Sequence, residues 1–409
     1  MTEKIQFDTV IIGGGAAGFF GAIHYKRERP DDRVVILEQS GQLLSKVKIS
    51  GGGRCNVTHA SFDPKILVSN YPRGSRELLG PFHQFGPNET VSFFEELDVK
   101  IKTESDGRMF PVSDSSDSII GALLTEASRL GIEIHISTKV QNIIYDKEIN
   151  LFNIGTSKSS YLTHKCLFAA GSSYTCWKLL EKLGVGIVDP VPSLFTFNID
   201  DKSLHGLAGI SVADAKVTVS HGKLQSSGPV LITHWGLSGP AILKMSAFGA
   251  RIFHGCDYRF PLQVDWLPHT FFPTYDDFKQ IAPKKQISFC PFESLPARLW
   301  LWFLQKSSIH IEKRYADLSK IEYHSLYQLV KSTDFEVNGK STFKEEFVTA
   351  GGVDLREVDF KKFEHKQVKG LFLAGEILNI DGVTGGYNFQ AAWTGGFMAA
   401  KAMAVVSNH

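Results

Sequence analysis

A glycine turn between a buried strand and an apolar helix, near the amino terminus, constrains this chain more than any other feature. The strand candidate is Phe7 to Ile12 (FDTVII), a short apolar run rich in β-branched residues. It leads directly into GGGAAG at 13–18 and then into the helix-like FFGAIHYKR. A second strand candidate, Arg33 to Leu37 (RVVIL), ends at Glu38. This order of strand, glycine turn, helix, strand and acid is typical of a dinucleotide-binding βαβ unit.

The residues of this unit have separate expected roles. Gly13 is predicted to make the tight turn, Gly15 to let backbone N–H groups reach a pyrophosphate, and Gly18 to allow close helix–strand packing. The helix amino terminus attracts the anion, and Glu38 is predicted to bind a ribose hydroxyl. The sequence therefore predicts a bound adenine dinucleotide, contacted by Gly13, Gly15, Ala16, Ala17, Gly18, Glu38 and Gln39.

Composition sets the class of protein. A chain of 409 residues with 43% hydrophobic content is long enough for two or three folded units. Its formal net charge of +1 argues neither for nor against nucleic acid. Five cysteines without CxxC spacing disfavour a disulfide framework or a structural zinc site. We therefore expect no metal. Because neither a leader nor a run of about eighteen apolar residues is present, we also expect a cytoplasmic protein with no membrane contact.

A second glycine-rich segment, KVKISGGGRCNVTH at 46–59, is predicted to be irregular. Three successive glycines lose too much backbone freedom to form a stable helix or strand interior. One interpretation is a flexible surface loop. The other is a backbone cradle against a flat, electron-rich ligand, with positive charge for phosphate or a reduced flavin. The residues predicted to bind the cofactor here are Lys46, Ser50, Gly51, Gly52, Gly53, Arg54 and Asn56.

The carboxyl-terminal region carries a related pattern. GLFLA at 370–374 is a buried strand candidate, and GVTGGYNFQAAWTGGFMAA at 382–400 is a glycine turn followed by an apolar helix. In FAD proteins with one Rossmann unit, a late Gly-Asp or Gly-Glu brings a carboxylate to the ribityl chain. The next helix then directs its positive end at the flavin. Alternatively, these glycines only pack a helix on a sheet. The predicted cofactor-binding residues are Gly375, Glu376, Asp381, Gly386, Tyr387 and Asn388.

Two strand candidates between the chain ends return to the same site. TKVQNII at 138–144 places Val140 to offer its backbone to adenine, and CLFAA at 166–170 brings Ala170 and Gly171 back to the nucleotide. No second strand-linked GxGxxG motif occurs in the sequence. A separate nicotinamide domain is therefore not expected, and NAD(P)H, if it is the electron donor, would bind transiently.

Several motifs together resemble the BaiN/RdsA-like family of FAD-dependent flavoproteins. The matching stretches run from one end of the chain to the other. They are VIIGGGAAG (10–18), KISGGGRCNVTH (48–59), DGRMFPVSDSSDSI (106–119), LITHWGLSGPAIL (231–243) and GLFLAGEILNIDGVTGGYNFQAAWTGG (370–396). His59 departs from the family pattern, in which many relatives have Asn, and Ser45 stands where relatives often have Gly or Arg. These departures concern the rim of the loop, and so the substrate more than FAD.

The resemblance implies an α/β fold with a Rossmann-type, p-hydroxybenzoate-hydroxylase-like domain that holds FAD non-covalently. This domain would comprise residues 1–192 and 349–409. An inserted β-rich domain would comprise residues 193–274 plus 333–348, and residues 275–332 would form a helical cap over the active site. Activities assigned to family members are reduction of a ribosomal RNA uridine to dihydrouridine, reduction of conjugated enones, and oxidation of small amines such as aminoacetone.

Three functional hypotheses are compatible with the sequence. A reductase acting on uridine in large-subunit ribosomal RNA needs phosphate-binding cations around its pocket. Residues 279–331 have nine Lys and Arg against four Asp and Glu, with Trp300, Trp302 and Tyr315 available for stacking. The alternative interpretation of this segment is a set of solvated helix faces over core aromatics. The other hypotheses are a small-molecule flavoenzyme (enone reductase or amine oxidase) and a non-catalytic FAD-bound interaction protein.

Three side chains are candidates for a catalytic role. Cys55, in the glycine-rich loop, is either a redox or acid–base thiol or simply a small buried residue. His234 follows the apolar run PVLIT and enters a turn, where it would donate a proton or clamp substrate, or only bond to the turn. Arg108, in DGRMFP, is a second pocket candidate.

Overall fold

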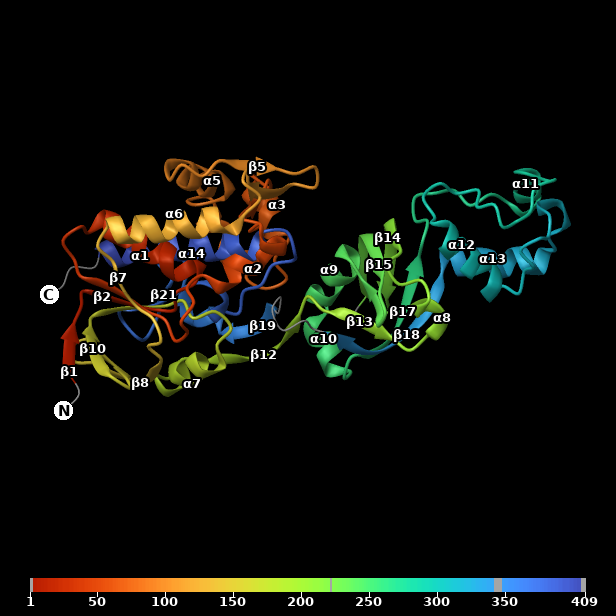
Figure 1. Cartoon of the computed structure of the whole chain (residues 1–409). Coiled ribbons are helices and arrows are strands. Elements are labelled where there is room, and N and C mark those ends of the chain that lie inside the picture. Colours follow the sequence, from red (N-terminus) through yellow and green to blue (C-terminus); the bar gives the residue numbers. More distant parts are fainter. Residues whose placement is uncertain (1–2, 221–222, 342–347, 406–409) are drawn as a thin grey trace. The chain divides into compact units, whose positions relative to one another are not determined.

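The computed structural model describes residues 3–220, 223–341 and 348–405, which divide into two compact units. The first unit comprises Met1–Pro190 and Val348–His409, and the second comprises Val191–Phe347. Figure 1 shows the first unit built from the red-to-yellow start and the blue end of the chain. The predicted α/β fold with a Rossmann-type domain is confirmed by this first unit, which contains a largely parallel sheet between helices.

The core of the first unit is a seven-stranded sheet in the order β20-β21-β22-β11-β2-β3-β7. The strands from β22 to β7 are parallel to one another, β21 runs antiparallel to its neighbours β22 and β20, and β20 forms the edge of the sheet. Every residue of TVII in β2 and VVIL in β3 is buried, as expected for strands covered on both faces. The bounds are β20 Val358–Asp359, β21 Glu364–His365, β22 Leu371–Leu373, β11 Lys165–Phe168, β2 Thr9–Ile12, β3 Val34–Leu37 and β7 Glu133–His135.

Two long helices from opposite ends of the chain lie side by side on this sheet. They are α1 (Ala16–Glu28) and α14 (Tyr387–Val405), which contact each other along their lengths (Figure 1). A Cβ on Gly396 would lie 2.6 Å from the carbonyl oxygen of Ala17, so only glycine allows this approach. The other helices of the unit are α2 Ser45–Gly53, α3 Pro64–Val68, α4 Ser75–Phe82, α5 Pro87–Glu96, α6 Ser116–Arg129, α7 Tyr174–Lys182, and the short turns η3 Leu355–Glu357 and η4 Gly375–Ile377.

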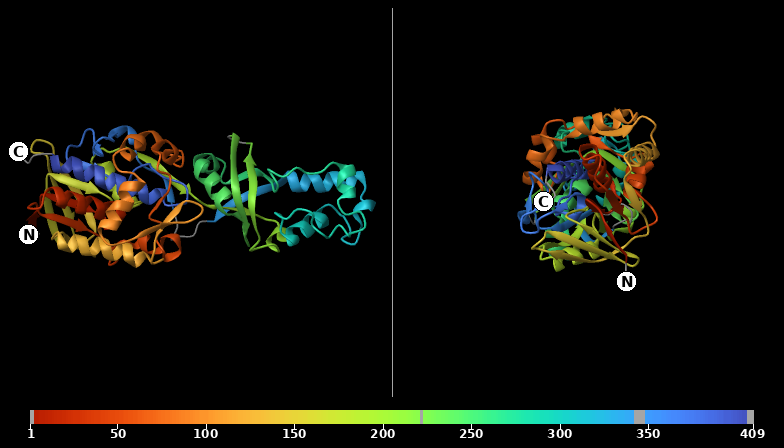
Figure 2. Two further views of the ribbon diagram at one scale, coloured as in Figure 1. Left: turned by 90° about the horizontal axis from the view of Figure 1, so that it is seen from above. Right: turned by 90° about the vertical axis from the view of Figure 1, so that its left-hand side faces the viewer.

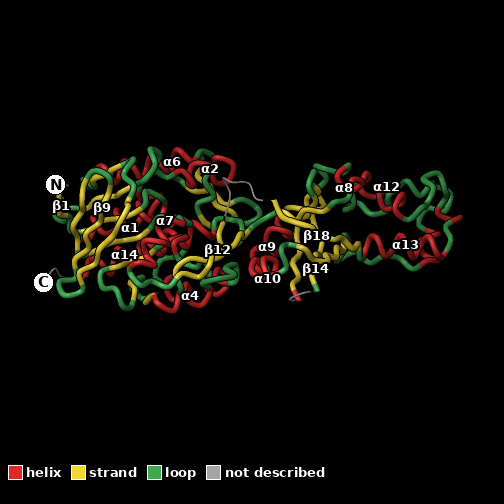
Figure 3. Tube along the Cα trace, turned by 90° about the horizontal axis from the view of Figure 1, so that it is seen from below, coloured by secondary structure: helices red, strands yellow, loops and turns green. Residues whose placement is uncertain are grey.

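Smaller sheets complete the first unit (strands in yellow, Figure 3). One has the order β1-β10-β9-β8 and contains the strand that begins at Val140. Another, β4-β6-β5, carries His59 and Arg108, and β12 pairs with β19. The bounds are β1 Glu3–Gln6, β10 Ser159–Thr163, β9 Leu151–Thr156, β8 Val140–Asp146, β4 Thr58–His59, β6 Arg108–Pro111, β5 Ile101–Thr103, β12 Ile187–Ser193 and β19 Val348–Val353.

The second unit contains a closed barrel of strands β13-β16-β15-β14-β17-β18, seen in Figure 2. The β-rich insertion that the resemblance implies is confirmed by this barrel, and in β14 the side chains of Val212, Ala215, Val217 and Val219 are buried in the core. The bounds are β13 Thr196–Ile199, β16 Gly236–Ser238, β15 Leu224–Ile232, β14 Ser211–Val219, β17 Arg259–Asp265 and β18 Thr333–Ser341. Helices α8 Lys202–His205, α9 Pro240–Phe248 and α10 Ala250–Gly255 belong to the same unit.

The segment 275–332 is largely helical and packs on the barrel through one continuous hydrophobic core. Its elements are α11 Tyr275–Gln280, α12 Ala297–Lys306, η2 Tyr315–Asp317 and α13 Lys320–Lys331. Because barrel residues such as Trp266 and helical residues such as Phe303 share this core, the two parts form a single compact unit. A separate helical domain, and its role as a cap over the active site, stay predictions.

Candidate functional site

The residues predicted to bind the cofactor gather at one edge of the seven-stranded sheet. All the parallel strands end at this edge, so the segments that follow them are neighbours. Gly13 follows β2, Glu38 follows β3, Gly171 follows β11 and Glu376 follows β22. This edge of the first unit is the candidate site.

The glycine turn combines close packing with one open position. Gly13 has φ +111°, and a Cβ there would lie 2.4 Å from the carbonyl oxygen of Ala169. A Cβ on Gly18 would lie 2.0 Å from the carbonyl oxygen of Gly13. At Gly15, by contrast, a Cβ would meet no atom within 4 Å, and Gly15 caps α1 without any side-chain hydrogen bond. The uncapped N–H groups of α1 therefore adjoin open space, and this arrangement fits the pyrophosphate of a dinucleotide.

Glu38 lies against the glycine turn. Its Oε2 accepts a hydrogen bond of 2.8 Å from the backbone N–H of Gly14, and its Oε1 accepts one of 2.8 Å from Ser40. Two N–H donors leave further lone pairs of the carboxylate for a ribose hydroxyl. The backbone N–H of Thr138 donates to the Glu38 carbonyl oxygen at 2.8 Å, which brings the start of β8, and with it the buried Val140, to the same place. The arrangement fits an adenosine half held between these segments.

The glycine-rich segment is helical at its start, which corrects the expectation of an irregular loop from Lys46 onward. Helix α2 begins at Ser45, because the sequence up to Ile49 contains ordinary helix-forming residues. The helical conformation breaks at Ser50 (ψ 147°), and Gly51 and Gly52 take left-handed conformations with φ of +57° and +69°. A Cβ on Gly52 would meet nothing within 4 Å. The three glycines thus leave the helix as predicted, and Gly52 presents bare backbone to open space, whereas a Cβ on Gly51 would lie 2.9 Å from the Phe110 ring.

The two arginines of this region converge on one carboxylate. Arg54 contacts Oε1 of Glu104 at 2.7 Å, and Arg108 contacts Oε2 of the same residue at 3.2 Å. Arg108 also pairs with Asp106 at 2.7 Å, and the Arg54 guanidinium lies 3.9 Å from the centre of the Phe110 ring. Part of the positive charge that the sequence assigned to a ligand is therefore offset within the protein. A direct role of either arginine at the cofactor or substrate stays a prediction.

Cys55 is completely buried, and burial raises the pKa of its thiol to about 12. Reactive cysteines are accessible and have a lowered pKa, so the structure favours the packing role over the redox role. We expect Cys55→Ala to retain FAD and activity. We also expect no titration of activity by this thiol between about pH 6 and pH 10, because it stays protonated throughout that range.

Mass-spectrometric mapping of iodoacetamide adducts tests the state of the Cys55 thiol. The native protein should leave Cys55 unmodified, and the urea-unfolded protein should be alkylated there. Rapid alkylation of the native protein, or loss of activity in Cys55→Ala with FAD still bound, would show that the thiol is reactive.

Lys46 and Glu376 meet across the site. They form an ion pair between α2 and η4, elements more than 300 residues apart in the chain. A Cβ on Gly171 would lie 3.9 Å from Oε2 of Glu376, so the segment after β11 reaches the same point. The structure thus brings together predicted cofactor residues from three separate segments. Because it pairs with Lys46, the Glu376 carboxylate is less available to bind a cofactor hydroxyl than a free carboxylate would be.

The loop before α14 is held by internal contacts. Asp381 is fully buried and pairs with Arg73, and the Asn388 side chain exchanges hydrogen bonds of 2.8 and 3.0 Å with the backbone of Gly382. With its amide nitrogen toward the carbonyl oxygens of Thr58 and Met109, Asn56 accepts a 3.0 Å hydrogen bond from the Gly386 N–H. Asp381, Asn388 and Asn56 therefore brace the loop. Direct contact of these three residues with FAD stays a prediction.

Four further residues shape this loop and were not singled out as site residues from the sequence. Arg73 holds Asp381, and the Tyr71 hydroxyl donates a 2.6 Å hydrogen bond to the Tyr387 carbonyl oxygen. Tyr387 stacks on His59 with ring centres 4.8 Å apart, and Nδ1 of His59 lies 2.9 Å from Ser61 Oγ. Burial lowers the pKa of His59. No sequence signal marks Arg73, because its partner Asp381 is more than 300 residues away in the chain. None marks Ser61, because serine is a common polar residue.

His234 lies in the second unit, in the turn between β15 and β16, where its side chain is exposed. Its backbone neighbour Trp235 is held by the turn, since the Trp235 N–H donates to Thr233 Oγ1 at 3.2 Å. The position is the strand end that the sequence indicated. A catalytic role for His234 stays a prediction.

The interpretation of Trp300, Trp302 and Tyr315 as a stacking platform is wrong. All three are buried, and each uses its polar atom within the unit. Trp300 donates to the Ile287 carbonyl at 2.7 Å, Trp302 to Ser203 Oγ at 3.0 Å and Tyr315 to the Phe289 carbonyl at 2.7 Å. These aromatic residues form the apolar side of α12 and its neighbours, as the alternative interpretation stated.

The comparison with known proteins agrees with this geometry. The model of the HI0933-like protein Rossmann domain matches residues 7–402. The chain belongs to this HI0933-like family. The FAD-binding fold of the family accounts for the glycine turn, the acid after the second strand and the return of the carboxyl terminus to the same sheet edge.

Curated relatives match the HI0933-like chain over almost its full length. A ribosomal RNA dihydrouridine synthase of Haemophilus influenzae is 27% identical, with 96% of this chain and 97% of the relative covered. A 3-dehydro-bile acid delta(4,6)-reductase of Clostridium scindens is 28% identical (96% and 98%). A ribosomal RNA dihydrouridine synthase of Escherichia coli is 26% identical (97% and 98%).

Solved structures support the fold. The 3-ketosteroid-delta4-(5alpha)-dehydrogenase of Rhodococcus jostii RHA1 has a TM-score of 0.52 at 12% identity, with 99% of this chain and 100% of that chain covered. The 3-ketosteroid delta1-dehydrogenase of Sterolibacterium denitrificans has a TM-score of 0.53 at 10% identity (98% and 99%). The family match and the curated relatives together identify the HI0933-like chain as an FAD-dependent oxidoreductase.

Two further features of the described residues concern membranes and metal ions. No helix within residues 3–220, 223–341 and 348–405 is both long and apolar enough to cross a membrane. Over the same ranges, no group of three or more His, Cys, Asp and Glu side chains is placed to hold a metal ion.

Proposed function

We propose that this protein uses NAD(P)H to reduce an activated carbon–carbon double bond, and that its substrate is a uridine of large-subunit ribosomal RNA in the cytoplasm. One observation carries the proposal. The relatives that match the chain from end to end are named for dihydrouridine synthesis on ribosomal RNA and for reduction of a bile acid double bond. Reduction of a conjugated C=C bond is the chemistry that these names share.

The candidate site supplies what such a reaction requires of the protein. When bound, FAD accepts a hydride and passes it on. The amino end of α1 would hold the pyrophosphate, and Glu38 the adenosine ribose. The uncapped backbone at Gly52 and the amino end of α14 would border the flavin, where the positive end of a helix favours negative charge. Transient binding of NAD(P)H is consistent with a single strand-linked glycine turn in the sequence.

A small-molecule substrate is the second candidate function. The bile acid reductase is as similar to this chain as the two RNA-modifying relatives are, with 28% identity against 27% and 26%. An enone reductase or an amine oxidase would need no cationic surface for RNA. Both candidate functions use FAD, so only identification of the substrate distinguishes them.

Mass-spectrometric mapping of dihydrouridine in large-subunit ribosomal RNA tests the proposal. Cells that lack the gene should lose one dihydrouridine, and the wild-type gene should restore it. Unchanged dihydrouridine on deletion would exclude the RNA substrate. Rapid anaerobic bleaching of the flavin by an amine would instead support an amine oxidase.

A further inference from the structure

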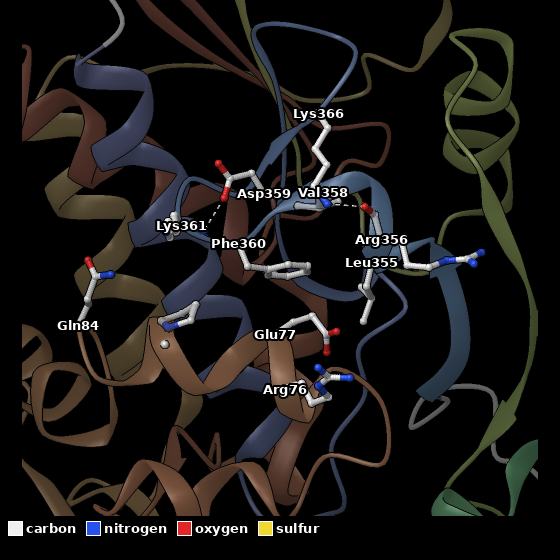
Figure 4. Close-up of a pocket in the computed structure, with 12 residues that line it drawn as sticks. Arg76, Glu77, Gln84, Leu355, Arg356, Val358, Asp359, Phe360, Lys361 and Lys366 are labelled. Atoms are coloured by element: carbon white, nitrogen blue, oxygen red, sulfur yellow. Dashed lines mark hydrogen bonds between the residues drawn. The ribbon is translucent and has the colours of Figure 1, made fainter.

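A groove of about 740 Å³ opens on the surface of the first unit, between α4 and the segment that runs from η3 to β21. Figure 4 shows the side chains that line it, which come from both walls. Arg76 belongs to one wall, and Arg356, Lys361 and Lys366 belong to the other. Glu77 and Asp359 also line the groove, so its cations outnumber its carboxylates by two to one.

The carboxylates of the second wall accept hydrogen bonds from backbone N–H groups, and its cations are exposed. Glu364 is buried and accepts a 3.1 Å hydrogen bond from the Gly370 N–H, and Glu357 accepts one of 2.7 Å from Gly186. Asp359 accepts a 3.0 Å hydrogen bond from the backbone of Lys361. These acids hold the backbone in place. The cations of the same segment are exposed: Arg356, Lys361, Lys362, Lys366 and Lys369.

An aromatic side chain lies among these cations. Phe360 lines the groove and is half-buried, with its ring edge-on to Phe363 at 5.1 Å. Cations interleaved with an accessible aromatic ring are the combination that binds a nucleic acid strand, through phosphate contacts and base stacking. Gln84 adds a neutral hydrogen-bonding group to the same groove.

Both walls of the groove are tied to the segment that leads to the predicted flavin site. Gly74, at the start of α4, packs against Ile380 so closely that a Cβ would lie 2.6 Å from its side chain. On the other wall, Val353 forms a bridge with Leu378, and the Asn379 N–H donates to the Val353 carbonyl at 3.1 Å. A strand lying in the groove would therefore approach the loop that precedes α14.

The helical segment of the second unit, residues 275–332, is less suited to binding a nucleic acid strand than its content of Lys and Arg indicates. Several of its cations are already used within the unit. Lys306 pairs with Asp201, Lys313 with Glu322 and Lys331 with Asp265, at 3.0, 2.7 and 2.9 Å. Its tryptophans are in the core. Lys285 still lies 4.0 Å from the centre of the exposed Phe289 ring in this segment. In the groove of the first unit, Arg356 pairs with Asp354 at 2.5 Å, and Arg76 and Lys361 are exposed around Phe360.

We propose that this groove binds the phosphate backbone of the RNA substrate and leads the strand toward the flavin edge of the sheet. The inference rests on the proposed function, since it names the surface that the RNA occupies. Arg76 and Lys361 contact phosphates, and Phe360 stacks on a base. Neither α1 nor the glycine-rich segment takes part, so the groove acts independently of FAD binding.

Binding of an in vitro large-subunit ribosomal RNA transcript to the FAD-loaded protein tests the groove. Affinity is measured across a series of salt concentrations for wild type, R76A/K361A and F360L. Each lost phosphate contact should lower the salt slope by about 0.7 to 0.9, and the double variant should bind roughly tenfold more weakly at moderate salt. F360L should lose roughly fivefold in affinity with an unchanged slope. All variants should keep the flavin absorbance of wild type.

K147A/K158A is the charge-matched control, because both lysines are exposed in the first unit outside the groove. Its slope and affinity should equal those of wild type. If R76A/K361A bound the transcript as tightly as wild type, or if K147A/K158A lost as much affinity as R76A/K361A, the groove would not be the RNA-binding surface. The proposal of an RNA substrate would then still stand. A wild-type protein that does not bind the transcript would overturn both proposals.

Discussion

Replacing Gly15 with alanine is expected to give a folded protein that has lost most of its FAD. Gly15 has an extended backbone (φ −98°, ψ −169°) that alanine adopts without strain, and a Cβ there meets no protein atom within 4 Å. The change costs the N-cap of α1 no more than about 1 kcal/mol. The added methyl group instead enters the space assigned to the pyrophosphate. We expect FAD binding to weaken by roughly tenfold or more, which corresponds to about 1.4 kcal/mol.

Titration of the FAD-free protein with FAD, followed by flavin fluorescence, measures this effect. Thermal unfolding without FAD is the matched readout of the fold and should be nearly unchanged. Gly13→Ala is the contrasting variant, because φ is +111° and its Cβ would lie 2.4 Å from the Ala169 carbonyl oxygen. It should lower the midpoint of unfolding as well. If Gly15→Ala bound FAD as wild type does, the pyrophosphate would not lie at the start of α1.

Replacing Asp381 with asparagine is expected to destabilise the first unit by about 3–5 kcal/mol. Asp381 is fully buried, and its carboxylate contacts Arg73, whose side chain is 15% exposed. Asparagine has nearly the same shape but removes the negative charge that faces Arg73 in a mostly dry environment. Urea unfolding, followed by loss of flavin absorbance at one fixed FAD concentration, reports on this unit.

The double variant R73M/D381N separates charge from shape in this prediction. Removing the arginine charge as well should recover part of the loss, because the buried positive charge that Asp381 balanced is then also gone. A loss below about 1 kcal/mol in Asp381→Asn would contradict the prediction. Additive losses in the double variant would show that the two residues are not coupled.

The parts of the fold that local patterns determine were predictable from the sequence. The strand before Gly13, the helix after it and the acid at Glu38 lie within about thirty residues of one another. Their apolar runs and glycine spacing follow from requirements of the backbone itself. The carboxyl-terminal strand and helix carry the same kind of local signal, so the return of both chain ends to one sheet edge was also predictable.

Pairings across long sequence distances were not predictable in this way. Arg73 meets Asp381, and Lys46 meets Glu376, each across more than 300 residues. A single sequence contains no information about which charges will meet after folding. The tryptophans of α12 illustrate a different difficulty. LWLWF suits both an exposed aromatic surface and the apolar face of a helix, and only the position of the barrel beneath it decides between them.

The contact between α1 and α14 constrains the order of events during synthesis. The ribosome releases the second unit, Val191–Phe347, before it has made strand β22 or helix α14. Until these last elements emerge, β11 lacks its neighbour β22, and α1 lacks the helix that packs along it. We therefore expect nascent chains to acquire FAD only after termination, and a truncation that removes α14 to purify without flavin absorbance.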